Sequence, residues 1–282
     1  MKLKEIRKTV FEKLKTDKTN QSPRLDGDLI VMHNLSLTKA DLITKDFEVS
    51  YDKVKKILSD TEKRLKKMPV AYILGKTEFM SLDFFVNEHT LIPRPDTEIL
   101  VEHILDEYKN KAEKIHLVDI GTGSGCIAIS LLKNQKNFTA TMLDISSGAL
   151  SVAKKNAEKH GVIDRATFLE HNILNGFLPQ IQNVDLIVSN PPYIPEKDIN
   201  SLMPDVKDYE PLSALSGGEN GLMFYESIIK NASLNMGGML AFEVGINQSQ
   251  SVAFLMRQNG FSDILTIKDY GGIDRVVSGR KL

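Results

Sequence analysis

The chain has 282 residues, about twice the usual size of a domain, with 41% hydrophobic and 26% charged residues. These values predict two domains or one large α/β unit, and they exclude a disordered, collagen-like or coiled-coil protein. The single cysteine, Cys126, excludes a disulfide framework and a thiolate zinc cluster, so no metal site is predicted and a reducing compartment is favoured. No apolar run reaches the ~18 residues of a membrane helix, and the charged residues 1–8 do not form a signal peptide. We therefore expect a cytoplasmic protein without a membrane partner.

The formal net charge of −1 hides an uneven distribution along the chain. Residues 1–76 hold 18 Lys and Arg against 11 Asp and Glu, a balance of +7, whereas the remaining residues have a balance of −8. Much of the positive charge lies between residues 53 and 67. This lysine-rich stretch is either a solvated helix face or a docking surface for an acidic or RNA-bound partner, and charge alone does not decide between them.

The first 75 residues are predicted to form a helical domain. An apolar face with helical spacing is formed by Leu3, Ile6, Val10 and Leu14. Residues 20–23 predict a loop, residues 29–32 a short helix leading to Leu35, and residues 38–41 a capping box. A further helix is marked by Tyr51, Val54, Leu58 and Leu65.

Residues 76–92 predict a β-hairpin linker, with strand-like runs at 78–80 and 84–86. Two prolines, Pro93 and Pro95, then precede a helix that begins near Asp96 or Thr97 and continues through Ile104. Further strands are predicted at 115–119, 138–144, 166–169, 184–189, 239–244, 264–267 and 275–278, and helices at 126–132, 150–160, 222–235 and 248–259. This alternation predicts an α/β domain over residues 93–282, with a mainly parallel sheet that ends in an antiparallel edge hairpin.

A glycine-rich segment connects the first strand of this domain to its first helix. It has the spacing D-x-G-x-G-x-G, with Asp119 followed by Gly121, Gly123 and Gly125, and Cys126 replaces the glycine that a dinucleotide fingerprint requires. A carboxylate at this turn would repel a pyrophosphate and attract a cationic amino group. Asp144 ends the next strand, where an acidic residue commonly binds ribose hydroxyls. The pattern favours S-adenosylmethionine over NAD, and the alternative is an ordinary tight turn.

Two weaker assignments concern the surroundings of this segment. Asn172 and Ile173 follow the third strand, where the adenine would lie, although an ordinary loop is the alternative. Cys126 lies beside Ile127 and Ile129 at the apolar start of a helix, so it is interpreted as a packing residue.

A second motif, Asn190-Pro191-Pro192-Tyr193, directly follows the strand at 184–189. Two prolines stiffen the loop and remove two N–H donors, so carbonyl oxygens face the ligand, and the motif adds an amide oxygen and an aromatic face. It suits a planar group that carries an NH₂, because the Asn190 oxygen and the Pro191 carbonyl would orient the nitrogen for attack on a methyl group. Tyr193 and the two acceptors would stabilise the positive charge that develops on this nitrogen. The alternative is a structural turn stiffened by prolines.

The two motifs together resemble those of the amino-group methyltransferases. Additional segments resemble the HemK-type methyltransferases of peptide chain release factors, namely residues 69–75 (PVAYILG), 78–79, 91–98 (LIPRPDTE), 210–211, 214–215, 217–218, 221–222, 243–245 and 274–277. This resemblance implies a Rossmann-like, seven-stranded methyltransferase fold with a helical, release-factor-binding N-terminal domain. It also implies methylation of the glutamine amide in the Gly-Gly-Gln loop of class I release factors, with S-adenosyl-L-homocysteine as product.

By the same resemblance, the residues that contact S-adenosylmethionine would be Gly121, Thr122, Gly123, Ser124, Gly125, Asp144 and Asn190. The glutamine would be held by Asn190, Pro191, Pro192 and Tyr193. The sequence departs from the family at Ser81, where a glycine is common, at Asp96, where Glu is commoner, and at Ile173, where some relatives place an aromatic ring. Arg94 would border the cofactor pocket without a defined role.

Two other functions are compatible with parts of this sequence. A DNA N(6)-adenine methyltransferase shares the Asn-Pro-Pro-Tyr chemistry, but it usually needs a basic DNA channel and a target-recognition segment. A non-enzymatic S-adenosylmethionine sensor with a basic RNA-binding head would have no use for a loop that orients a nucleophile. We therefore expect that the basic N-terminal helices bind the release factor, or a polyanion near it, while the acidic body does the chemistry, and we expect no DNA partner.

Overall fold

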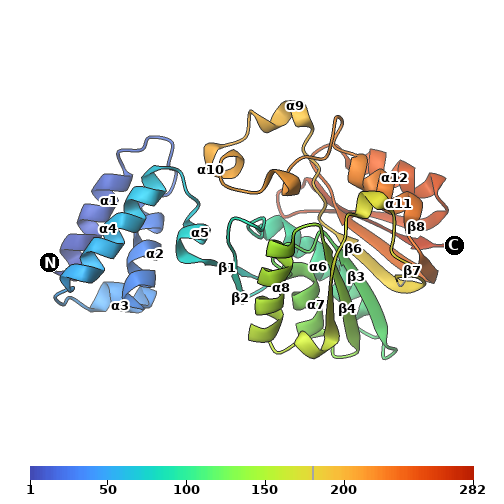
Figure 1. Cartoon of the computed structure of the whole chain (residues 1–282), viewed down its shortest axis with the longest axis horizontal. Coiled ribbons are helices and arrows are strands. Elements are labelled where there is room, and N and C mark those ends of the chain that lie inside the picture. The colour runs from blue at the N-terminus through green and yellow to red at the C-terminus, as the bar shows by residue number, and fades with distance from the viewer. Residues whose placement is uncertain (180) are drawn as a thin grey trace. The chain divides into compact units, whose positions relative to one another are not determined.

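The computed structural model describes residues 1–179 and 181–282. The chain forms two compact units (Figure 1). Unit 1 contains Met1–Lys76 together with Met203–Tyr209, and unit 2 contains Thr77–Leu202 and Glu210–Leu282. The segment Met203–Tyr209 lies far along the sequence from its unit, within the range 93–282 that the sequence assigned to one domain.

Unit 1 is built mainly from five helices, α1 (Leu3–Leu14), α2 (Pro23–Leu35), α3 (Lys39–Thr44), α4 (Tyr51–Leu65) and α5 (Val70–Leu74). The predicted apolar face of α1 is confirmed, because its four residues are fully buried against Ile30, Val31 and Ile57. The predicted capping box is also confirmed, since the Thr38 hydroxyl accepts from the Asp41 N–H and the Asp41 carboxylate accepts from the Thr38 N–H. The predicted short helix at 29–32 is wrong in length, because Pro23 occupies the first turn of α2, where its missing N–H is not needed.

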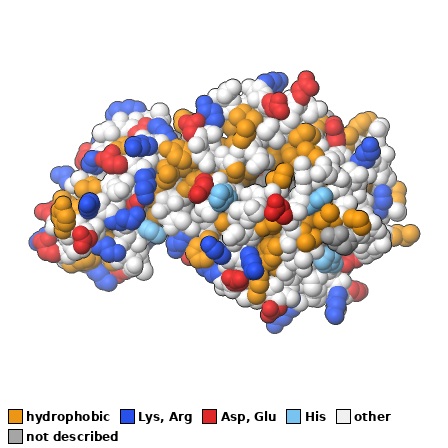
Figure 2. All heavy atoms as spheres, in the orientation of Figure 1, with side chains coloured by type: hydrophobic (Ala, Val, Ile, Leu, Met, Phe, Trp, Pro, Cys, Tyr) orange, Lys and Arg blue, Asp and Glu red, His pale blue; other side chains and the backbone are white. Residues whose placement is uncertain are grey.

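Most cations of the lysine-rich stretch have partners inside unit 1. Arg64 Nε lies 2.7 Å from Asp26 Oδ2, and both side chains are largely buried. Lys63 binds the buried Asp60 at 2.8 Å, and Lys67 binds Asp17 at 2.5 Å. On the face that Figure 2 shows, acidic side chains are interspersed among the basic ones of these helices. These three cations therefore stabilise the helical unit itself, and a charge reversal there would disturb its fold.

The predicted hairpin is present as β1 (Lys76–Phe79) and β2 (Leu82–Phe85). Its turn places Met80 and Ser81 at positive φ, 50° and 59°, which explains why a glycine is favourable at this position. Within unit 2, the hairpin residues Phe79 and Phe84 are buried in the main core.

A seven-stranded sheet forms the centre of unit 2 (Figure 1), and its strand order is β5-β4-β3-β6-β7-β9-β8. Its strands are β3 (Ile115–Ile120), β4 (Phe138–Asp144), β5 (Ala166–Glu170), β6 (Val184–Ser189), β7 (Leu234–Glu243), β8 (Phe261–Lys268) and β9 (Asp274–Lys281). The first five are parallel, whereas β9 pairs antiparallel with both β7 and β8. The predicted parallel sheet with a terminal antiparallel hairpin is confirmed.

Helices cover both faces of this sheet. One core contains residues of α6 (Pro95–Tyr108), α7 (Cys126–Asn134) and α8 (Ser147–Lys159), and the other contains residues of α11 (Met223–Asn231) and α12 (Ser249–Gln258). Short helices α9 (Glu196–Ile199) and α10 (Pro204–Lys207) and the 3₁₀ turns Ile163–Arg165, Ile173–Asn175 and Leu212–Ala214 complete the chain. Over residues 1–179 and 181–282, no helix is long and apolar enough to cross a membrane.

The predicted helix at 222–235 and the strand at 239–244 are wrong at their shared boundary. Helix α11 ends at Asn231, and β7 already begins at Leu234, which pairs with Val184. The register then shifts before Leu186 pairs with Met239, and Gly237 adopts a φ of 75° within this irregular stretch. The strand is therefore extended by pairing with β6, which an apolar pattern along one segment does not reveal.

Candidate active site

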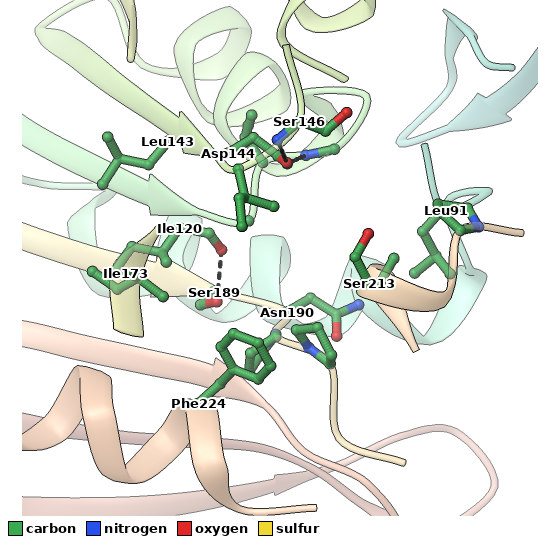
Figure 3. Close-up of a pocket in the computed structure, with 18 of the residues that line it drawn as sticks. Leu91, Ile120, Leu143, Asp144, Ser146, Ile173, Ser189, Asn190, Ser213 and Phe224 are labelled. Atoms are coloured by element: carbon green, nitrogen blue, oxygen red, sulfur yellow. Dashed lines mark hydrogen bonds between the residues drawn. The ribbon is translucent and has the colours of Figure 1, made fainter. Parts of the chain in front are cut away.

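A cavity of about 220 Å³ opens at the carboxyl ends of β3, β4 and β6, where open α/β sheets bind their ligands (Figure 3). Asp144 and Ser146 lie on one side of it, and Asn190 and Ser213 lie on another. The two predicted motifs therefore contribute to a single cavity. Those predicted site residues that line it are Gly121, Thr122, Gly123, Ser124, Asp144, Asn172, Ile173, Asn190, Pro191 and Pro192.

The glycine loop, residues 121–125, turns sharply between β3 and α7. Gly125 is the N-cap residue of α7 with a φ of 82°. A Cβ atom at this position would lie 2.7 Å from Met142 Cε and 2.8 Å from Ile129 Cδ1. The backbone therefore approaches the core more closely than any other residue would allow.

Asp119 lies beneath the glycine loop and is fully buried. Its Oδ2 accepts from the Thr122 hydroxyl at 2.7 Å and from the Ala128 N–H at 3.3 Å. Its Oδ1 has no hydrogen-bond partner among the described residues, and burial raises the pKa of this carboxyl to about 7. Asp119 thus fixes the shape of the loop, while its direct contact with a cofactor stays a prediction, because the described lining of the cavity does not include it.

Asp144 lines the cavity at the end of β4, in line with its predicted position. Its two carboxylate oxygens accept from the backbone N–H groups of Gly123 and Ser146, each at 2.9 Å. Burial raises the pKa of this carboxyl in spite of these bonds. The carboxylate is therefore held in one orientation, with lone pairs left for hydroxyl donors.

The part of the cavity beyond Asp144 is apolar. Ile173 and Leu143 are buried here, and Phe224 from α11 lines the cavity with them (Figure 3). The Asn172 side chain accepts from the Leu174 N–H at 3.0 Å and so caps the turn that holds Ile173. An apolar surface next to a carboxylate suits a purine nucleoside.

The reaction loop, residues 190–193, follows β6 directly. Asn190 donates through Nδ2 to the Thr97 hydroxyl at 3.2 Å, and Pro191 and Pro192 line the cavity beside it. The Tyr193 hydroxyl lies 3.4 Å from Glu243 Oε1, and the described lining of the cavity does not include this residue. Its contact with a substrate stays a prediction.

Gln248 is hydrogen-bonded to the last residue of the reaction loop. Its Nε2 donates to the Tyr193 carbonyl at 2.9 Å and to the Gly221 carbonyl at 3.3 Å, while its Oε1 accepts from the Gly245 N–H at 3.0 Å. One side chain thus joins three loops at the edge of the sheet. No sequence pattern marks it, because the three partners are brought together only by the fold.

Three further residues that line the cavity are Ser189, Arg94 and Cys126. Ser189 ends β6 and donates to the Ile120 carbonyl at 2.7 Å, which joins the two central strands under the cavity (Figure 3). Arg94 lines the cavity, as predicted, and pairs with Glu210, whose other oxygen accepts from the Ile92 N–H. Cys126 lines the cavity as well as packing in the core, and burial raises the pKa of its thiol to about 12, so it is not a nucleophile at neutral pH.

Comparisons with known proteins agree with this architecture. Residues 95–204 match the methyltransferase small domain, and residues 5–75 match the PrmC N-terminal domain. Among solved structures, the fold is similar to a methyltransferase from Pyrococcus furiosus (TM-score 0.52, 18% identity, 82% of this chain and 99% of that chain). It is also similar to the hMettl16 catalytic domain in complex with the MAT2A 3′UTR hairpin 6 (TM-score 0.57, 15% identity, 83% and 84%). Fold and cavity together define a methyltransferase of the Rossmann-like class.

Curated relatives define the family more narrowly. The chain is 42% identical to the release factor glutamine methyltransferase of Clostridium botulinum, over 92% of this chain and 93% of the relative. It is 40% identical to that of Geobacter sulfurreducens, over 94% and 92%. The chain belongs to the release factor glutamine methyltransferase family.

Proposed function

We propose that this protein transfers a methyl group from S-adenosyl-L-methionine to the side-chain amide nitrogen of the glutamine in the Gly-Gly-Gln loop of class I release factors, and so modulates translation termination in the cytoplasm. One observation carries this proposal: the reaction loop and the glycine loop line the same cavity. Membership of the release factor glutamine methyltransferase family supports release factors as the substrate class.

The cavity fits S-adenosylmethionine by the chemistry of its lining. Asp144 would bind the ribose hydroxyls, and the apolar surface around Ile173 would hold the adenine. The backbone of residues 121–125 would lie along the amino-acid end of the cofactor. When bound, S-adenosylmethionine supplies an electrophilic methyl group on a sulfonium.

Residues of the reaction loop prepare the substrate amide. The Asn190 Oδ1 and the Pro191 carbonyl would accept hydrogen bonds from the glutamine NH₂, which fixes the nitrogen in position and draws its lone pair out of conjugation. Both acceptors gain strength as positive charge develops on this nitrogen, so they favour the transition state over the ground state. The products are N(5)-methylglutamine, S-adenosyl-L-homocysteine and a proton.

A transfer assay tests this function directly. Purified protein, S-adenosylmethionine labelled in its methyl group and an intact class I release factor should give one labelled glutamine per release factor. A release factor with Gln→Ala in its Gly-Gly-Gln loop is the matched control and should remain unlabelled. Label on this control, or label only on duplex DNA, would contradict the proposal, and the second result would favour a DNA methyltransferase.

The helical N-terminal domain, residues 1–75, is the part that we propose binds the release factor. Among the described ion pairs and hydrogen bonds, none involves the Lys55 or Lys66 side chains, which are exposed on and just after α4. Reversing both charges (K55E/K66E) should raise the KM for release factor about 10-fold without changing that for S-adenosylmethionine, since steering by surface charge acts on the macromolecular partner. Steady-state kinetics at low and high salt measure this effect.

The control for this double variant is Lys136→Glu, on an exposed turn of unit 2 before β4. It changes the net charge in the same direction and should leave both KM values unaltered. Equal KM values for release factor in the double variant and the parent protein would identify Lys55 and Lys66 as merely solvated.

A further inference from the structure

A buried hydrogen-bonded chain lies behind the reaction loop, and we call Asn190, Thr97 and Glu243 the relay. Asn190 Nδ2 donates to the Thr97 Oγ1 at 3.2 Å, and the Thr97 hydroxyl donates to the Glu243 Oε2 at 2.5 Å. Thr97 and Glu243 are 2% and 1% exposed, so water does not compete for these bonds. Three elements meet here, since Thr97 lies in the first turn of α6 and Glu243 ends β7.

The order of donors along the relay determines which atom of Asn190 faces the cavity. An ionised Glu243 can only accept, so the single hydroxyl proton of Thr97 is directed to it. The Thr97 oxygen can then only accept, and of the two ends of the Asn190 amide only the NH₂ can satisfy it. The Asn190 Oδ1 is thereby left free to accept from a ligand, which is the orientation that a substrate NH₂ requires.

We propose that Glu243, acting through Thr97, is a positioning residue that fixes the Asn190 amide with its oxygen toward the substrate. This inference rests on the proposed function, because only an NH₂-bearing substrate needs an acceptor at this position. Glu243 does not line the cavity in the described part of the chain, so its effect on the reaction is transmitted by hydrogen bonds alone.

The protonation state of Glu243 also controls the hydrogen-bond directions in the relay. Burial raises the pKa of this carboxyl from 4.5 to about 7, against the lowering effects of the Thr97 hydroxyl and Arg275. A protonated Glu243 can donate to the Thr97 oxygen. The Thr97 hydroxyl can then donate to the Asn190 oxygen, and the amide is held with its NH₂ instead of its oxygen toward the substrate. The groups that face Glu243 electrostatically from the surrounding elements are Asp96, Cys126, Tyr193, Tyr225 and Arg275.

Two isosteric substitutions test the relay in the full-length protein with an intact release factor. Thr97→Val keeps the shape but removes the hydroxyl, and kcat should fall about 100-fold, comparable to the loss of one oriented group in an active site. Glu243→Gln can donate or accept, so it fixes the amide only partly and kcat should fall about 10-fold. Thr97→Ser restores the hydroxyl and should recover most of the loss. The KM for release factor should change less than the kcat in all three variants.

Readouts other than turnover separate positioning from folding. The kcat of the parent protein should decline below pH about 7, and this decline should be absent in Glu243→Gln. A raised pKa means that the native state loses stability as the pH rises from 4.5 to about 7, so Glu243→Gln should melt no lower than the parent protein at pH 8. S-adenosylmethionine affinity, measured by calorimetry, should remain within about 3-fold of the parent value because the relay holds the substrate acceptor.

The outcomes distinguish this inference from the function on which it rests. A parent protein that labels no release factor would overturn the proposed function. An active parent whose Thr97→Val and Glu243→Gln variants keep the same kcat would overturn the relay alone. A parallel loss of kcat, cofactor affinity and melting temperature that Thr97→Ser does not repair would also overturn it, since that pattern belongs to a packing defect.

Discussion

Replacing Asn190 by alanine is expected to lower the rate of methyl transfer by about 100- to 1000-fold, the usual effect of removing one preorganised group that stabilises a transition state. Asn190 lines the cavity and its amide donates to Thr97, so the substitution removes one of the two proposed acceptors of the substrate NH₂. S-adenosylmethionine affinity should fall by only about 3-fold, because the glycine loop and Asp144 remain intact. Single-turnover transfer and calorimetric titration of the cofactor measure the two quantities separately.

A matched control is Asn231→Ala at the end of α11. Its amide also donates one hydrogen bond within the protein, to the Ser227 carbonyl at 2.8 Å, but it lies outside the described lining of the cavity. Its transfer rate should equal that of the parent protein. An Asn190→Ala variant with a parental rate would mean that the substrate amide is held by other groups, and the assignment of the reaction loop would have to be abandoned.

The second large effect concerns folding rather than chemistry. Gly125→Ala should reduce the free energy of unfolding by about 3 kcal/mol, since an L-residue at positive φ costs about 1–2 kcal/mol and the forced contact adds about as much again. The new Cβ would lie 2.7 Å from Met142 Cε and 3.3 Å from Ala153 Cβ, both in the core beneath the glycine loop. Urea denaturation measures the loss, and cofactor affinity should fall with it because the loop must move.

Gly161 provides the control for the contact. It also has a positive φ, 66°, but a Cβ there would meet no atom within 4 Å. Gly161→Ala should therefore cost only about 1 kcal/mol, the backbone contribution, and leave cofactor affinity unchanged. Equal losses in the two variants would show that the close approach at Gly125 has no energetic importance.

Much of unit 2 could be predicted from the sequence, because its central strands are short apolar runs with clear ends. The strands Phe138–Asp144 and Val184–Ser189 have the predicted bounds. Prediction was poorer where pairing rather than local pattern decides, as at the start of β7, and where a proline begins a helix instead of ending a loop, as at Pro23 in α2. Local patterns could not assign Met203–Tyr209 to unit 1 either, since its contacts are with residues distant in sequence.

For the site, motifs that are contiguous in sequence predicted contiguous parts of the cavity lining. The sequence did not predict which residues hold these motifs in position. Thr97, Glu243 and Gln248 come from three separate elements, and each acts through hydrogen bonds that only the folded chain creates. The direction in which a side chain points, as for Asp119 beneath the glycine loop, is likewise decided by packing rather than by residue type.

Asn156 on α8 shows how closely the hairpin and the glycine loop are connected. Its fully buried amide exchanges two hydrogen bonds with the backbone of Phe85 in β2, at 2.7 and 3.0 Å, and donates to the Ser124 carbonyl at 2.8 Å. Amide protons of β2 and of the glycine loop should therefore exchange with solvent in one cooperative opening, because neither segment can separate from α8 without breaking the same junction. A ligand that protects one of the two segments from exchange will then protect the other. Slower exchange of the β2 amide protons should therefore report that the cavity is occupied.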